Sequence, residues 1–165
     1  MYKVMDVSRY IINHLNDEGS SVSNLKLQKL LYFVQGFFLC IKDEPCFEER
    51  IEAWDFGPVV PKVYHEYKIF GANSIPSIEG HFEFSSHGNS IEVRKIIFDD
   101  SIFSDIDKGI INMVLDKLKK YSATKLVDIT HNQAPWQKAY ECGRNNTISN
   151  ESIKECFEKG YFGNE

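Results

Sequence analysis

The chain has 165 residues, a length typical of one domain, and we expect residues 1–165 to fold as a single unit. Hydrophobic residues make up 42% and aromatic residues 13% of the sequence, so a core can form and disorder of the whole chain is excluded. The formal net charge is −5, which gives no basic surface for a phosphate backbone. Nucleic acid is therefore disfavoured as a partner.

Targeting features and cysteine spacing predict a cytoplasmic location. The amino terminus from Met1 to Tyr10 lacks the long apolar segment of a secretory signal. The most apolar stretch, Leu30 to Ile41, is shorter than the roughly 20 residues that span a bilayer, so no membrane segment is expected. Free thiols and no zinc site are expected because no cysteine pair has C-x-x-C spacing; the cysteines are Cys40, Cys46, Cys142 and Cys156.

The amino-terminal part of the chain predicts two helices. Asp6 is a candidate N-cap for the first helix, which Gly19 ends. Ser23 is a candidate N-cap for the second helix, which Pro45 closes. The second helix is expected to be central because few of its positions suit water; its apolar residues are Leu27, Leu30, Leu31, Val34, Phe37, Phe38 and Ile41.

Residues 46–71 predict an extended connector, a rigid loop and a short helix. The connector covers residues 46–52 and leads into residues 53–56. Residues 57–61 are expected to form a rigid loop, because glycine permits unusual dihedrals and the residue before each proline is pushed towards extended geometry. Pro61 suits the first turn of a helix of about ten residues, and Gly71 suits its left-handed end.

The middle of the chain predicts a β-hairpin. Phe82 and Phe84 alternate with Glu83, and apolar and charged residues also alternate from Ile91 to Lys95. Residues 86–89 have the composition of a connecting turn.

The rest of the chain predicts further helices. Ser104, with Asp107 three residues later, resembles a capping box, and Ser122 and Asn150 are candidate N-caps of two more helices. Residues 136–142 are expected to add a turn or two. The predicted fold is mainly α, in the α+β sense, with about six helices and a small antiparallel β-hairpin.

Motifs of catalysis and of cofactor or metal binding are missing from the sequence. It contains no G-x-x-x-x-G-K-[ST] phosphate loop, no G-x-S-x-G elbow and no G-x-G-x-x-G after a strand. His65-Glu66 begins a zinc-protease H-E-x-x-H motif, but the second histidine position is Ile69. We therefore expect no catalysis, no cofactor and no metal.

Three polar or aromatic side chains could still take part in a site. His131 is a conceivable general base, although we favour hydrogen bonds from it to backbone groups. Trp136 is expected to pack in the core and to donate its indole N–H. Gln35 lies within an apolar helix and needs a partner from another segment, which could equally be a loop or a ligand.

Three stretches together resemble one known family. Residues 23–35 (SNLKLQKLLYFVQ) match its signature in the second helix, and residues 51–64 (IEAWDFGPVVPKVY) match its loop-and-helix signature. Residues 126–131 (LVDITH), followed by residues 134–136 (APW), match its third signature in the same order. The chain resembles the Panacea domain, the SocA-like antitoxin family, which includes many phage-associated proteins.

The resemblance implies a mainly helical antitoxin that neutralises a protein toxin by direct binding. The toxin would be encoded by the adjacent gene, and an acidic binder suits a basic toxin. One branch of the family is a proteolytic adaptor, so a protease is a further implied partner. The motif positions are candidate partner-binding residues, none of them catalytic: Lys29, Gln35, Trp54, Asp55, Gly57, Pro58, His131 and Trp136.

Two alternative functions stay open. The chain could be a prophage or mobile-element protein that binds a host factor. It could also be an enzyme or small-ligand receptor that uses His131, Gln35 and Asp55 around a pocket. A pocket lined by these three side chains would favour the ligand-binding alternative, whereas side chains bonded to the backbone would count against it.

Overall fold

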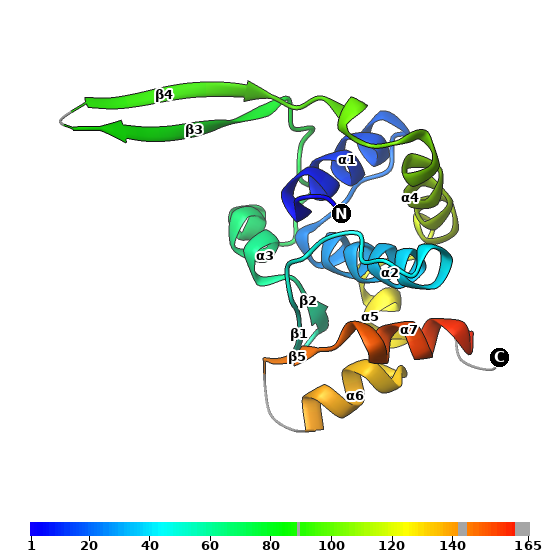
Figure 1. Cartoon of the computed structure of the whole chain (residues 1–165). Helices are drawn as coiled ribbons and strands as arrows, with labels where there is room; N and C mark the ends of the chain where they lie inside the picture. Colours follow the sequence, from blue (N-terminus) through cyan, green and yellow to red (C-terminus); the bar gives the residue numbers. More distant parts are fainter. Residues whose placement is uncertain (89, 142–144, 161–165) are drawn as a thin grey trace.

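Helix α2 (Asn24–Lys42) runs through the centre of the fold (Figure 1). The structure is a computed structural model, and it describes residues 1–88, 90–141 and 145–160. In α2, 14 of the 19 residues are buried, which confirms the prediction of a central helix. The Ser23 side chain accepts a hydrogen bond from the Lys26 backbone N–H, so the predicted N-cap is also confirmed.

Four helices, together with the shorter α3 (Pro61–Tyr67), pack against α2 and form the core with it. The four are α1 (Val4–Asp17), α4 (Asp105–Leu118), α5 (Ala123–His131) and α7 (Asn150–Glu158). The rings of Tyr32, Phe33 and Phe157 meet edge to face between α2 and α7, with centroids 5.6–5.7 Å apart. The Ser104 and Ser122 side chains cap α4 and α5 as predicted.

Two shorter helices complete the set of seven α-helices within the described residues. Helix α3 (Pro61–Tyr67) continues into the 3-10 turn η1 (Lys68–Phe70), and together they form the predicted short helix. Helix α6 (Ala134–Glu141) is one helix more than expected, because Pro135 lies in its first turn, where proline is tolerated. The mainly α fold with antiparallel β structure is confirmed.

Two predicted N-caps are wrong. Helix α1 begins at Val4, so Asp6 lies inside its first turn, where its carboxylate pairs with Arg9 at 2.8 Å. Ser149 rather than Asn150 caps α7, because the Ser149 hydroxyl accepts a hydrogen bond from the backbone of Ser152. In each case the cap lies no more than a turn away in the sequence, so local preference alone does not choose between the candidates.

A small antiparallel sheet lies beside the amino-terminal half of α2. Its strand order is β2 (Gly57–Val59), β1 (Ile51–Trp54) and β5 (Asn146–Ile148). Trp54 pairs with Gly57, so the expected rigid loop is instead a tight turn followed by an edge strand, where proline is permitted. Strand β5 was not predicted, because three residues carry no alternating pattern.

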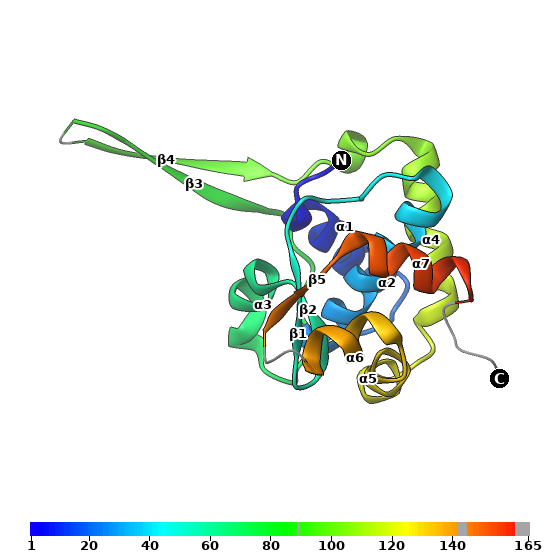
Figure 2. The same ribbon diagram turned by 60° about the horizontal axis from the view of Figure 1, so that its bottom comes forward.

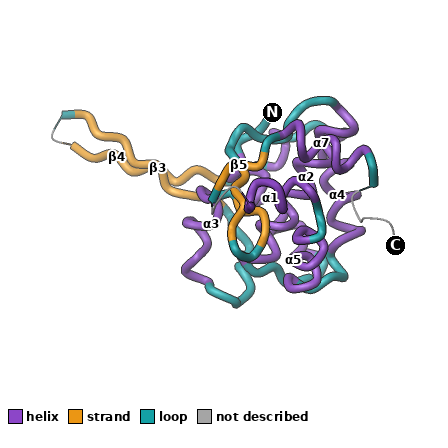
Figure 3. Tube along the Cα trace, turned by 90° about the horizontal axis from the view of Figure 1, so that it is seen from below, coloured by secondary structure: helices purple, strands orange, loops and turns teal. Residues whose placement is uncertain are grey.

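The predicted hairpin is a two-stranded arm that projects from the helical body (Figures 1 and 2). Strands β3 (Gly80–His87) and β4 (Ser90–Ile97) pair in antiparallel register, with Phe84 opposite Val93. Figure 3 shows the arm extending away from the helices. Asn89, in the predicted turn, lies outside the described residues.

Three expectations from the sequence concern the thiols, a membrane-spanning segment and a metal site. The thiols of Cys40, Cys46 and Cys156 are free, whereas Cys142 lies outside the described residues. Among the helices that the structure describes, none combines the length and apolar character needed to cross a bilayer. Within the same residues, no three His, Cys, Asp or Glu side chains gather where they could hold a metal ion.

Candidate functional site at the turn between β1 and β2

The turn between β1 and β2 is built around a glycine that no other residue fits well. Gly57 has φ of +92°, in the left-handed region that disfavours side chains. A Cβ at this position would lie 2.8 Å from Thr130 Oγ1 and 2.9 Å from Lys29 Cε. The turn therefore approaches α2 and α5 so closely that even a methyl group would force the Thr130 or Lys29 side chain to shift.

Lys29 anchors this turn to α2. Its side chain is fully buried on α2, and its Nζ donates a 2.8 Å hydrogen bond to the Pro58 carbonyl. Burial lowers the pKa of the Lys29 ammonium from 10.5 to about 7. The side chain thus tethers β2 to α2 through a backbone carbonyl, at the cost of an amine in an apolar environment.

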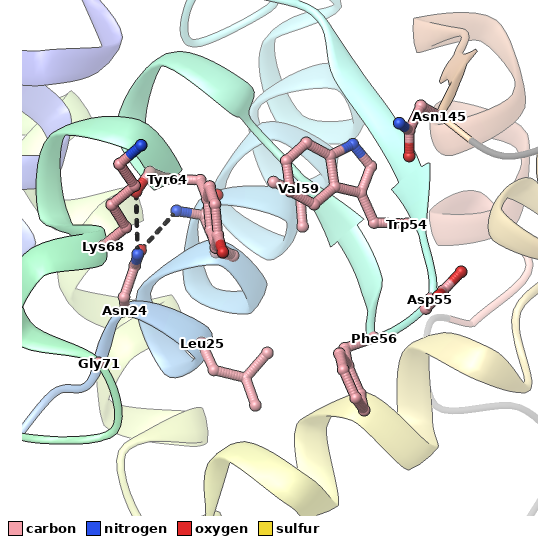
Figure 4. Close-up of a pocket in the computed structure, with 11 residues that line it drawn as sticks. Asn24, Leu25, Trp54, Asp55, Phe56, Val59, Tyr64, Lys68, Gly71 and Asn145 are labelled. Atoms are coloured by element: carbon pink, nitrogen blue, oxygen red, sulfur yellow. Dashed lines mark hydrogen bonds between the residues drawn. The ribbon is translucent and has the colours of Figure 1, made fainter.

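The first turns of α2 add a second tether. Gln28 Oε1 accepts a 2.9 Å hydrogen bond from the Val60 N–H, and its Nε2 donates to Asn24 Oδ1 at 2.9 Å. Asn24 Nδ2 in turn donates to the Tyr64 carbonyl at 3.1 Å (Figure 4). This chain of amides fixes the end of β2 and the start of α3 on α2.

Helix α6 covers the outer side of the turn with an aromatic stack. The Trp136 ring stacks on His131 at 4.0 Å and on Tyr140 at 4.6 Å between centroids. The Trp136 indole donates to the Trp54 carbonyl at 3.0 Å, as expected for this N–H, although the ring is only partly buried. The Tyr140 hydroxyl donates to Asp55 Oδ1 at 2.8 Å.

His131, the last residue of α5, contacts the turn. A hydrogen bond joins its side chain to the Asp55 backbone, while Nε2 is buried without a hydrogen-bond partner in the described part of the chain. Burial, followed by the positive charge of Lys29, lowers the pKa of the His131 imidazole. The neutral ring is therefore favoured at pH 7, where it packs between the turn and Trp136.

The structure brings together all but one of the sequence-predicted site residues. The side chains or backbones that meet at the turn are those of Lys29, Trp54, Asp55, Gly57, Pro58, His131 and Trp136. Gln35 lies further along α2, where its Oε1 accepts hydrogen bonds from the N–H groups of Cys46 and Phe47. Of the two partners considered for Gln35, the structure shows a loop.

A pocket of about 580 Å³ opens beside the turn (Figure 4). Trp54, Phe56 and Tyr64 provide its aromatic walls, and Asp55 and Lys68 contribute charges. The Trp54 and Tyr64 rings meet at 4.9 Å, and Phe56 is 67% exposed. His131 and Gln35 do not line this pocket, so the three-residue arrangement required by the enzymatic alternative is not formed there.

A family model and a known protein both match long segments of this chain. The family model described as "Antitoxin SocA-like, Panacea domain" matches residues 27–137, which include all eight positions predicted from the sequence. The chain belongs to this family. It is 36% identical to Antitoxin SocA of Caulobacter vibrioides (strain NA1000 / CB15N) over 134 residues, which are 78% of this chain and 68% of that protein. No solved structure is significantly similar to the chain.

Several residues of this Panacea site were not among the predicted positions. Tyr140 lies four residues after Trp136, and this helical spacing could have indicated that the two rings share a face. Gln28 and Thr130 lie inside matched signatures, but their contacts with Val60 and Gly57 depend on distant segments. No local pattern in the sequence identifies those two contacts.

Proposed function

We propose that this chain is an antitoxin that neutralises a protein toxin by direct binding. The observation that carries the proposal is its 36% identity to Antitoxin SocA across 78% of the chain, within a shared family. The proposed toxin is the product of the adjacent gene.

The geometry of the turn supports a binding scaffold more than a catalytic site. Lys29 is enclosed, His131 is bonded to backbone, and the Asp55 carboxylate accepts a hydrogen bond from Tyr140. Each of these three groups thus makes a contact that holds the turn. A rigid turn next to the exposed Phe56 ring lowers the ordering cost of binding another protein.

The charge of the chain supports a cationic partner. With a formal net charge of −5, it attracts a basic protein over long range and speeds the encounter. Toxins that act on nucleic acids or ribosomes are commonly cationic. Complex formation is then expected to be faster at low salt than at high salt.

The test is co-expression in a bacterial host. The adjacent gene is induced alone, with this chain, and with a version of this gene that carries an early stop codon. We expect growth arrest in the first and third cultures, growth in the second, and co-purification of the two proteins. Rescue with neither a complex nor a loss of the toxin, or no toxicity at all, would contradict the proposal and favour the host-factor alternative.

A proteolytic adaptor role is the second part of the proposal, and the same cultures test it. After synthesis is blocked, an adaptor shortens the half-life of the toxin, whereas simple sequestration preserves or lengthens it. Deletion of individual host proteases identifies the enzyme in the first case. A stable toxin in the presence of this chain restricts the proposal to sequestration.

A further inference from the structure

The projecting arm has one apolar face that the described residues leave uncovered. Paired residues in an antiparallel ribbon share a face, and successive residues alternate between the faces. One face therefore carries all of the following side chains, which are 52–74% exposed: Phe82, Phe84, Ile91, Val93 and Ile97. Two-stranded hairpins are only marginally stable in water, so such a face is typical of a surface that becomes covered.

The opposite face of the arm carries most of its charges, although Ile96 shares that face and Lys95, paired with Phe82, lies on the apolar face. Glu83 pairs in register with Arg94, and the Arg94 guanidinium lies 2.9 Å from Glu92 Oε1. These groups are suited to water, so the arm is amphipathic across its thickness. A partner is therefore expected to contact one face and to leave the other hydrated.

The base of the arm is fixed to the helical body. Asn13 on α1 donates from Nδ2 to the Ile78 carbonyl at 2.9 Å, and its Oδ1 accepts from the Ile78 N–H at 2.7 Å. The Phe98 N–H donates to the Glu79 carbonyl at 2.8 Å and closes the ribbon at its root. The arm thus leaves the body in a set direction, which lowers the ordering cost when it binds.

The charges of the arm favour a protein over a membrane or a nucleic acid. Residues 80–97 contain two acidic residues, Glu83 and Glu92, and two basic residues, Arg94 and Lys95. Anionic lipid surfaces and phosphate backbones both require an excess of cations. The arm has exposed phenylalanines and no excess of cations, so its chemistry suits an apolar groove on a protein.

The size of the face also disfavours a second copy of this chain as its occupant. The five apolar residues expose about 600 Å² in total, taking about 150–200 Å² for each fully exposed residue. A stable interface buries about 800 Å² on each partner, so two faces in simple apposition fall short. A groove that also encloses the free strand edges covers more of the arm.

We propose that the apolar face of the β3–β4 arm inserts into an apolar groove of the protein toxin and supplies a principal part of the binding energy. This inference rests on the proposed antitoxin function and deepens it by naming the contact surface.

The test uses full-length variants of the arm. Phe84→Thr combined with Val93→Thr removes apolar surface from one cross-strand pair while threonine keeps a high strand propensity. A second variant replaces residues 84–93 by Asn-Gly, which closes a two-residue turn between Glu83 and Arg94. Ile106→Thr is the matched control, because Ile106 is 73% exposed on α4, away from the arm.

The readouts are rescue of growth, the Kd for the adjacent gene's product and the melting temperature. We expect the double variant to raise Kd about 30-fold and the shortened arm to abolish rescue, while the control matches the wild type. Melting temperatures within about 3 °C of the wild type verify that each variant is folded.

The outcomes separate the two proposals. If the wild type neither rescues growth nor binds, both the antitoxin proposal and the arm proposal are overturned. If the wild type rescues and the arm variants bind equally well, only the arm proposal is overturned. It is likewise overturned if the double variant converts a wild-type dimer into a monomer, or abolishes binding to phosphatidylcholine–phosphatidylglycerol vesicles, without altering rescue.

Discussion

The indole N–H of Trp136 donates a 3.0 Å hydrogen bond to the backbone carbonyl of Trp54. This bond joins α6 to the last residue of β1, 82 positions earlier in the sequence. It also places the ring between His131 and Tyr140, so that one side chain links α5, α6 and the turn after β1. Two of the three signatures of the family therefore meet at this residue.

Substitutions of Trp136 separate the hydrogen bond from the ring stack. Trp136→Phe keeps an aromatic ring but loses the donor, so we expect the free energy of unfolding to fall by about 1 kcal/mol. Trp136→Ala also removes the stacked surface, and we expect a loss of about 3 kcal/mol, at the low end for buried aromatics because the ring is partly exposed. Urea unfolding followed by circular dichroism measures both values. A Trp136→Ala variant as stable as the wild type would contradict the proposed linking role.

A pair of glycine variants tests the close approach of the turn to α2 and α5. Gly57→Ala combines a positive φ with contacts to Thr130 and Lys29, and we expect it to lower the free energy of unfolding by about 3 kcal/mol. Gly19→Ala is the matched control, because Gly19 has φ of +72° but nothing within 4 Å of an added Cβ. We expect that variant to lose about 1 kcal/mol. Equal losses in thermal or urea unfolding would mean that the turn can move away from the two helices.

The sequence predicts those parts of the fold that depend on neighbouring residues. The caps at Ser23, Ser104 and Ser122 follow from side-chain bonds over three residues, and the structure forms all three. Strand β5 escapes prediction because Ile51 and Ile148 pair across most of the chain. Its three residues become a strand only when β1 is already beside them.

The candidate site was predictable as a set of residues but not as an arrangement. The signatures that contain Lys29, Pro58 and His131 are far apart in the chain, and only the tertiary fold brings them to one turn. Alternation of Phe82 and Phe84 with polar residues predicts the arm correctly. The same pattern normally indicates a half-buried strand, however, and so it does not predict that this face is exposed.

Substitution of Gln35 tests whether its side chain stabilises the fold or contacts a partner. Gln35→Met removes the acceptor for the Cys46 and Phe47 N–H groups, so we expect the free energy of unfolding to fall by about 2 kcal/mol. The affinity for a toxin should stay unchanged at temperatures where the variant is folded. Gln137→Met is the control, because Gln137 is exposed and its Nε2 donates a hydrogen bond to the His131 carbonyl. Weaker toxin binding by folded Gln35→Met would place Gln35 in the contact surface instead.

The buried amine of Lys29 predicts a specific dependence of stability on pH. Because burial lowers the pKa of Lys29 from 10.5 to about 7, the unfolded chain binds more protons than the folded chain between these values. The stability of the wild type relative to Lys29→Met should therefore rise as the pH increases from about 7 towards 10, by at most about 1.4 kcal/mol per pH unit. Below about pH 6 the lysine is charged in both states, so its own contribution to the difference should be constant. Urea titrations of both proteins across this range measure the difference, and repeating them at high salt should give the same curve, because burial rather than a neighbouring charge lowers the pKa. Parallel stability curves for the two proteins would show that the amine is hydrated in the folded chain.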